Sequence, residues 1–197
     1  MENLIEINAE KLGVLIDLRY GSENNVCKQK MYSQKMRCFL QKDAYEKFLK
    51  AIKLAKNLGY KFKIWDAFRP LQVQQFMYDK FPEDENGVAF ISNPKTGSIP
   101  HCRGVAIDLT LCDLKGNEIE MGTDFDNFSP LAFHACTKIS KQAQKNRLIL
   151  LGIMTLAGFD FYTAEWWHYQ LFDARKFKII NTPAHKLLIN NLSYAAS

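Results

Sequence analysis

Long apolar segments are absent from this chain of 197 residues. No run approaches the roughly 20 apolar residues that a membrane-spanning helix needs, which excludes insertion in a membrane. Blocks of Lys and Arg interleaved with aromatic residues are also missing, which argues against a nucleic-acid partner. The net charge of +5 comes instead from Lys interleaved with Asp and Glu along most segments. That pattern is typical of a solvated surface.

The cysteines do not form CxxC pairs. Their number, five, is odd, so neither a zinc ribbon nor a CxxC redox motif is expected, and we predict free thiols in a reducing compartment. They are Cys27, Cys38, Cys102, Cys112 and Cys136. The first residues lack the basic start and apolar core of a signal peptide, because Glu2, Glu6 and Glu10 are acidic. We therefore predict a cytoplasmic protein, or a periplasmic one if an export segment was removed.

Internal repeats, low-complexity tracts and Pro/Gly/Ser linkers are absent as well. With 47% hydrophobic residues the chain can bury a core, and we expect one domain over residues 1–197. Apolar periodicity predicts three helices and three strands. The helices cover residues 43–58, 70–80 and 139–157, and the strands cover 61–65, 105–111 and 164–172. Without repeated βαβ units, this order predicts an α+β fold with a mainly antiparallel central sheet flanked by helices.

Histidine is scarce, and the informative point is which residues accompany each of the four. His101 and Asp108 belong to the segment SIPHCRGVAID, and His168 belongs to AEWWHY. Two imidazoles and one carboxylate are the protein ligands of many catalytic zinc sites, which keep the fourth position for water. We predict that these three residues hold the metal, and that His134 and His185 are structural or exposed.

Glu165, three residues before His168, is the candidate base that takes a proton from such a water. On a regular strand, residues three apart point to opposite faces. Glu165 therefore shares a site with His168 only if it precedes the strand on a turn. Thr163 and Ala164 leave room for that turn.

The pattern HxxGxAxD, formed by His101, Gly104, Ala106 and Asp108, is followed later by ExWH. This pair of motifs resembles the peptidoglycan-related zinc peptidases that cleave next to D-amino acids. More narrowly, the chain resembles the vancomycin-resistance-type D-alanyl-D-alanine dipeptidases. The segments that carry this resemblance are, in chain order, LRY, WDAFRP, HCRGVAIDLTL, MGTDFD and EWWHY.

The resemblance implies a dipeptidase with one zinc ion per chain, bound in a cleft on the sheet, and a small dipeptide as substrate. His101, Asp108 and His168 match the zinc ligands, and Glu165 matches the general base and acid. One position departs from the family, which usually has Ser two residues before the first zinc ligand. Here that position is Ile99, so the hydroxyl that helps hold the substrate backbone is lost or shifted.

Three further residues match family positions around the substrate. Arg69 matches the arginine that stabilises the negative oxygen formed as water adds to the carbonyl. Asp126 matches the carboxylate that receives the substrate's ammonium group, and Tyr20 lies where the family closes the same end of the pocket. The alternatives are an ordinary ion pair for Arg69, a solvated loop acid for Asp126 and a packed core aromatic for Tyr20.

Two other functions stay open for the chain as a whole. One is a zinc D,D- or L,D-carboxypeptidase that trims longer peptidoglycan peptides, and the other is a non-catalytic zinc-binding domain. The presence of both Glu165 and Arg69 argues against the second, because a structural site has no use for a base and normally fills its fourth position with protein. The oligomeric state does not follow from the sequence.

Overall fold

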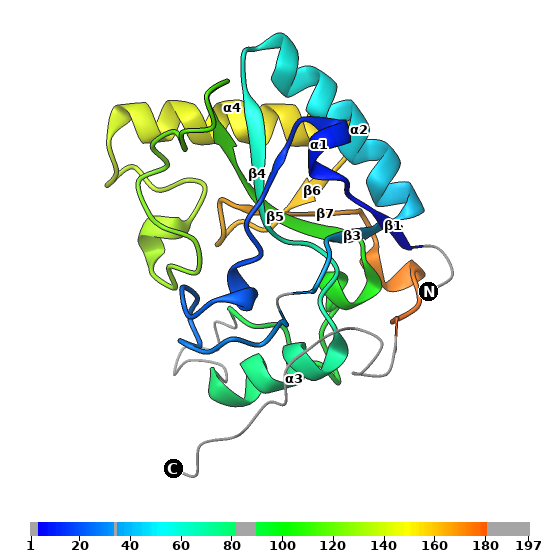
Figure 1. The fold of residues 1–197 in the computed structure, drawn as a ribbon. Coiled ribbons are helices and arrows are strands. Elements are labelled where there is room, and N and C mark those ends of the chain that lie inside the picture. Colours follow the sequence, from blue (N-terminus) through cyan, green and yellow to red (C-terminus); the bar gives the residue numbers. More distant parts are fainter. Residues whose placement is uncertain (1–3, 34, 82–89, 181–197) are drawn as a thin grey trace.

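A mixed five-stranded sheet is the centre of the computed structural model, which describes residues 4–33, 35–81 and 90–180 (Figure 1). In spatial order the strands are β2 (Leu15–Ile16), β4 (Lys61–Asp66), β5 (Ala106–Cys112), β7 (His168–Gln170) and β6 (Asp160–Phe161). β2 and β4 are parallel, and the other neighbouring strands are antiparallel. The predicted α+β fold with a mainly antiparallel sheet is therefore confirmed.

Two long helices cover one face of this sheet (Figure 1). They are α2 (Lys42–Asn57) and α4 (Lys141–Ala157), and they pack against each other. Each ends close to a glycine, because Gly59 and Gly158 adopt the left-handed conformation that stops a helix. The third predicted helix is α3 (Leu71–Lys80), which follows Pro70 and lies apart from the other two.

The shorter elements were not predicted, because they are too short for apolar periodicity to reveal them. They are α1 (Ala9–Leu12) and the antiparallel pair β1 (Leu4–Glu6) and β3 (Phe39–Gln41), together with β2 and β6. Four 3₁₀ helices add to them, at Arg19–Gly21, Pro100–Arg103, Pro130–Ala132 and Ala174–Lys176.

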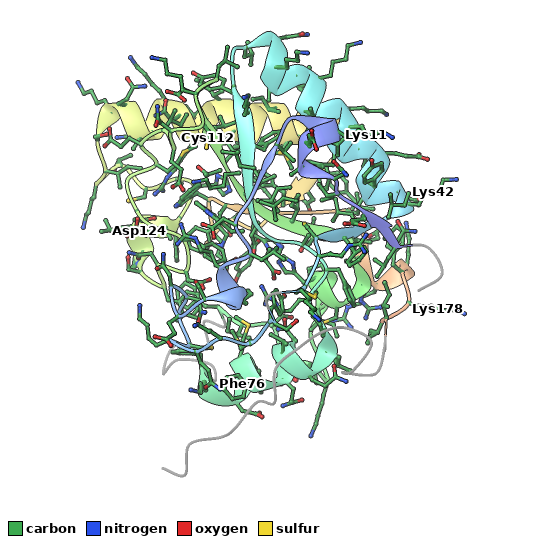
Figure 2. The ribbon with its side chains drawn as sticks, viewed as in Figure 1. Lys11, Lys42, Phe76, Cys112, Asp124 and Lys178 are labelled. Carbon is green, nitrogen blue, oxygen red and sulfur yellow. The ribbon has the colours of Figure 1, made fainter. Side chains whose placement is uncertain are left out.

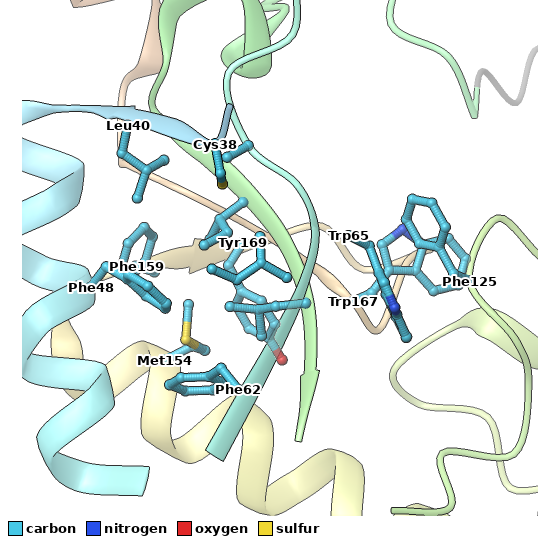
Figure 3. Close-up of a cluster of buried hydrophobic side chains, with 14 of the residues drawn as sticks. Cys38, Leu40, Phe48, Phe62, Trp65, Phe125, Met154, Phe159, Trp167 and Tyr169 are labelled. Atoms are coloured by element: carbon cyan, nitrogen blue, oxygen red, sulfur yellow. The ribbon is translucent and has the colours of Figure 1, made fainter. Parts of the chain in front are cut away.

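The core lies on both faces of the sheet (Figure 3). On one face, Phe48 of α2, Phe62 of β4 and Met154 of α4 meet between the helices and the strands. On the other, Trp65 and Phe125 pack in a tilted arrangement with ring centroids 5.1 Å apart, and Trp167 packs against Phe125. Every residue of β5 is buried, including the polar Asp108 and Thr110, because the strand lies in the middle of the sheet.

The strand predicted over residues 164–172 is wrong at both ends. β7 covers only His168–Gln170, because the preceding backbone forms a turn instead of a ladder. The amide of Glu165 donates to Tyr162 O, and the amide of His168 donates to Glu165 O. Glu165 therefore precedes the strand on a turn, as its proposed role required.

The exposed lysines and the free cysteines match what the sequence predicted. Lysines such as Lys11, Lys42 and Lys178 project outward from the molecule (Figure 2). All five cysteines are free, as predicted. Residues 90–99 form neither helix nor strand. His185 and the end of the predicted domain lie outside the described residues, so the boundaries 1–197 stay a prediction.

A buried arginine holds the loop between β5 and α4. Arg147 is only 2% exposed. Its Nε donates to Met121 O at 2.7 Å, and its Nη1 donates to Leu131 O and Phe133 O at 2.9 and 3.0 Å. These carbonyls do not belong to a strand, so the guanidinium donates the hydrogen bonds that a neighbouring strand would otherwise provide. The loop that carries Asp126 is thus anchored to α4.

We expect Arg147→Met to lower the free energy of unfolding by about 3 kcal/mol, because the carbonyls of Met121 and Leu131 lose their donor. Urea unfolding followed by tryptophan fluorescence measures this change. Lys145→Met, on the exposed side of the same helix, is the matched control and should change stability by less than about 0.5 kcal/mol. Equal effects of the two substitutions would contradict the anchoring role.

Candidate active site

The antiparallel register brings three acidic or basic side chains to the same level of the sheet. Asp66 at the end of β4 lies opposite Asp108 of β5, and Asp108 lies opposite His168 at the start of β7. A pocket of about 320 Å³ opens at this level. All the site residues predicted from the sequence line it: Tyr20, Arg69, His101, Asp108, Asp126, Glu165 and His168.

The predicted metal ligands form a tight, buried group. His101 Nε2 lies 3.2 Å from His168 Nδ1 and 3.3 Å from Asp108 Oδ1, and His168 Nδ1 lies 2.9 Å from the same oxygen. Metal–ligand bonds of about 2.0–2.2 Å in a tetrahedron place ligand atoms about 3.3–3.6 Å apart. The spacing of the three atoms is therefore close to that around a zinc-sized ion.

Hydrogen bonds on the far side of each ring set the imidazole tautomers. His101 Nδ1 lies 2.6 Å from the carbonyl oxygen of Ala67, which only accepts, so Nδ1 carries the proton. His168 Nε2 lies 3.1 Å from Gln170 Oε1 and donates to it in the same way. In the neutral rings, His101 Nε2 and His168 Nδ1 then direct lone pairs toward each other and toward Asp108. A cation at their meeting point satisfies all three, so the residues fit a metal ion.

Charge within the group follows from these contacts. Burial opposes ionisation of Asp108, but the two histidines outweigh it and hold the pKa of Asp108 well below its usual value. Burial also opposes charging of His168, and the hydrogen bond to Asp108 reverses the effect and raises the pKa of His168. The carboxylate is thus in the anionic form that a metal requires.

Glu165 stands beside this group on the turn before β7. Its Oε2 lies 4.0 Å from His168 Nδ1, and the residue is 8% exposed. Burial raises the pKa of Glu165 to about 8, while the charge on His168 acts in the opposite direction. A carboxyl group with a pKa near neutrality is suited to both accepting and returning a proton.

Arg69 is buried and its guanidinium is held from several sides. Its Nε donates to Asp66 Oδ2 at 2.8 Å, and its Nη1 donates to Gln74 Oε1 at 3.0 Å. Its Nη2 lies 3.4 Å from Tyr20 Oη and 3.6 Å from Asp108 Oδ2. The surface ion pair considered for Arg69 is excluded, since the contacts are internal and the group lies next to the predicted metal ligands.

Asp126 and Tyr20 close one end of the pocket. Tyr20 Oη donates to Asp126 Oδ1 at 3.2 Å, and the amide of Val26 donates to Asp126 Oδ2 at 3.2 Å. Loss of surrounding water raises the pKa of Asp126 to about 7, although the Val26 amide and Arg69 act in the opposite direction. Asp126 has a φ of 59°, a left-handed conformation that Asp tolerates better than most residues. Tyr20 is both a core aromatic and a pocket residue, since it is 1% exposed.

Several pocket residues were not found from the sequence. Gln170 lies two residues after His168 on the same face of β7, so strand periodicity could have revealed it. No sequence motif marks Gln74, because its side chain faces the pocket only as a result of where α3 begins. Phe90 and Phe128 stack with centroids 4.6 Å apart and give the pocket an apolar wall, although neither lies in a recognisable motif.

Ile99, His134 and Cys102 lie near the site but outside the group of predicted ligands. Ile99 is 1% exposed, lines the pocket and has a φ of 38°, an unfavourable conformation for a β-branched residue. His134 packs its ring against Phe161 and Tyr169, in agreement with a structural role. Cys102 is buried next to His101, yet it is not part of the group of potential metal ligands.

Comparison with known proteins decides the family. Residues 3–186 match the profile of the M15 peptidases, described as D-ala-D-ala dipeptidase. The chain belongs to this family. It is therefore a peptidase, and the M15 peptidases are metal-dependent enzymes. Among the described residues, no helix is long and apolar enough to cross a membrane.

Relatives of this M15 peptidase come from several bacteria. The D-alanyl-D-alanine dipeptidase of Escherichia coli (strain K12) is 36% identical over 165 residues, which are 84% of this chain and 82% of the relative. That of Enterococcus faecium is 36% identical over 65% of this chain and 70% of its own. The protein of the same name in Streptomyces coelicolor (strain ATCC BAA-471 / A3(2) / M145) is 32% identical over 59% and 65%, respectively.

If His101 is a ligand, His101→Ala should weaken binding of a divalent metal by more than about 100-fold, because only two protein ligands remain. Competition with a chelator measures the Kd for Zn²⁺ in the parent and the variant. His134→Gln removes a histidine outside the group and should leave the Kd unchanged. Parent-like affinity in His101→Ala would rule out this group as the metal site.

Proposed function

We propose that this M15 peptidase is a zinc-dependent dipeptidase that hydrolyses the peptide bond of D-alanyl-D-alanine or a similar D,D-dipeptide. The observation that carries the proposal is the convergence, in one pocket, of a potential metal-ligand group, a buried carboxyl, a buried guanidinium and a second acid. The names of the relatives, D-alanyl-D-alanine dipeptidase, support the choice of substrate.

His101, Asp108 and His168 would hold one zinc ion per chain. Two nitrogens and one oxygen suit zinc and leave a position for water or substrate. When bound, the ion supplies Lewis acidity, which polarises the substrate carbonyl and lowers the pKa of water.

The other residues of the pocket would act on the substrate directly. Glu165 takes a proton from the attacking water and passes it to the nitrogen of the leaving D-alanine. Arg69 offers its remaining N–H groups to the carbonyl oxygen, which gains negative charge as water adds. Since the guanidinium is already held in place, it needs no rearrangement during the reaction.

Asp126 would bind the ammonium group at the start of the substrate, assisted by Tyr20. A carboxylate fixed at this end of the pocket requires a free amine close to the scissile bond. Longer peptides place an amide there instead, which cannot pair with the acid. The pocket therefore favours dipeptides over the peptides that a carboxypeptidase trims.

The cysteines bear on the location in the cell. All five cysteines are free, in keeping with the predicted cytoplasmic compartment. We propose that location on this ground. A periplasmic location stays the alternative.

We expect Glu165→Gln to lower kcat for D-alanyl-D-alanine by about 10²–10⁴-fold, because the amide cannot accept the proton. Zinc content, measured by atomic absorption, should stay at one ion per chain. Release of free D-alanine gives the rate. Turnover within tenfold of the parent would eliminate Glu165 as the base.

Substrates that differ only at the amine test the pocket around Asp126. The zinc-loaded parent should cleave D-alanyl-D-alanine and refuse both its N-acetylated form and a longer peptide with the same C-terminal pair. Asp126→Asn should raise KM for the free dipeptide at least about tenfold, since a charge-assisted hydrogen bond is lost. Asp124→Asn, an exposed neighbour, is the matched control (Figure 2). Cleavage of only the blocked or longer substrates would identify a carboxypeptidase.

A further inference from the structure

We infer that Gln74 is a positioning residue, which sets the orientation of the Arg69 guanidinium and joins it to the pocket loop around Ser92. This inference rests on the proposed function, in which Arg69 faces the reacting carbonyl. Gln74 lies outside the motifs that identified the site.

The contacts of Gln74 determine which way its side-chain amide oxygen and nitrogen point. The residue sits in the first turn of α3 and is 2% exposed. Its Oε1 accepts from Arg69 Nη1 at 3.0 Å, and its Nε2 donates to Ser92 O at 2.7 Å. Arginine only donates and a carbonyl only accepts, so the oxygen must face Arg69 and the nitrogen must face Ser92. Both ends of the amide are therefore committed.

Gln74 adds a hydrogen-bond acceptor at Nη1 of Arg69, beside the acceptor that Asp66 provides at Nε. Asp66 holds Arg69 at Nε, close to the axis about which the terminal nitrogens turn. Gln74 holds Nη1, away from that axis. With both in place, Nη2 is directed toward Tyr20 Oη and Asp108, on the pocket side. Without Gln74, Nη1 loses its acceptor and Nη2 keeps only its longer contacts with Tyr20 Oη and Asp108 Oδ2, so the terminal nitrogens are held less firmly toward the substrate oxygen.

The second contact of Gln74 reaches a loop that lines the pocket. Ser92 Oγ lies 3.5 Å from the amide nitrogen of Ile99, and an added Cβ at Gly97 would lie 2.1 Å from Ser92 Oγ. The loop thus folds back tightly on Ser92, and holding Ser92 also holds the segment that leads to Ile99. One amide therefore holds both the arginine and the segment from Ser92 to Ile99 that lines the same pocket.

A simpler explanation is that Gln74 only satisfies a buried loop carbonyl. Two variants separate the explanations. Gln74→Glu keeps an acceptor for Arg69 but removes the donor to Ser92 O. Gln74→Met removes both contacts at nearly constant length. Gln72→Met, on the exposed side of the same helix, is the matched control.

The test measures kcat and KM for D-alanyl-D-alanine in the zinc-loaded proteins, and repeats Gln74→Met in an Arg69→Ala background. We expect Gln74→Met to lower kcat by about 10–100-fold, as small misplacements of catalytic groups do, with zinc content unchanged. Gln74→Glu should keep kcat within about threefold of the parent and raise KM. Because Gln74 acts through Arg69, Gln74→Met should change kcat by less than about twofold once Arg69 is absent. An equal loss of kcat in both backgrounds would overturn the inference.

A second readout does not depend on turnover. In ¹⁵N NMR spectra, the Nη hydrogens of Arg69 should give separate signals in the parent and Gln74→Glu, and averaged signals in Gln74→Met, where the guanidinium rotates. Separate signals in Gln74→Met would refute the positioning role even if no D-alanine is released. A parent that releases none overturns the proposed function alone, so the two failures are distinguishable.

Discussion

The alignment of Asp66, Asp108 and His168 across three neighbouring strands is the constraint on which the site depends. Because side chains alternate along a strand, a shift of one residue in either pairing would move a ligand to the opposite face. β5 lies between the other two strands and is buried throughout, so its register is strongly specified. The hydrophobic core thus positions the polar site.

Acidic side chains outnumber basic ones in the pocket at this level of the sheet. Among the described residues that line the pocket, Asp108, Asp126 and Glu165 are acidic, and Arg69 is the one Lys or Arg. An excess of buried carboxyl groups is unfavourable unless cations balance it. A divalent metal at one end and a substrate ammonium at the other would provide that balance. The same excess explains why Arg69 has so many internal partners.

The loops that complete the pocket are held by side chains that substitute for regular structure. Arg147 binds the carbonyls of the segment that precedes α4, and Gln74 binds the carbonyl of Ser92. Long polar side chains rooted in helices can satisfy irregular backbone without a strand partner. The result is a pocket whose walls are irregular but anchored to α3 and α4.

The sequence was sufficient for the long elements, for the members of the metal-ligand group and for Glu165 on a turn, because periodicity and motif spacing are local properties. It could not reveal the short strands, the start of β7 only at His168, or the hydrogen bond from Gln74 to the carbonyl of Ser92. Those features depend on which segments pair and which carbonyls lack a partner. Such contacts join residues far apart in the chain, and they exist only once the sheet has brought those residues together.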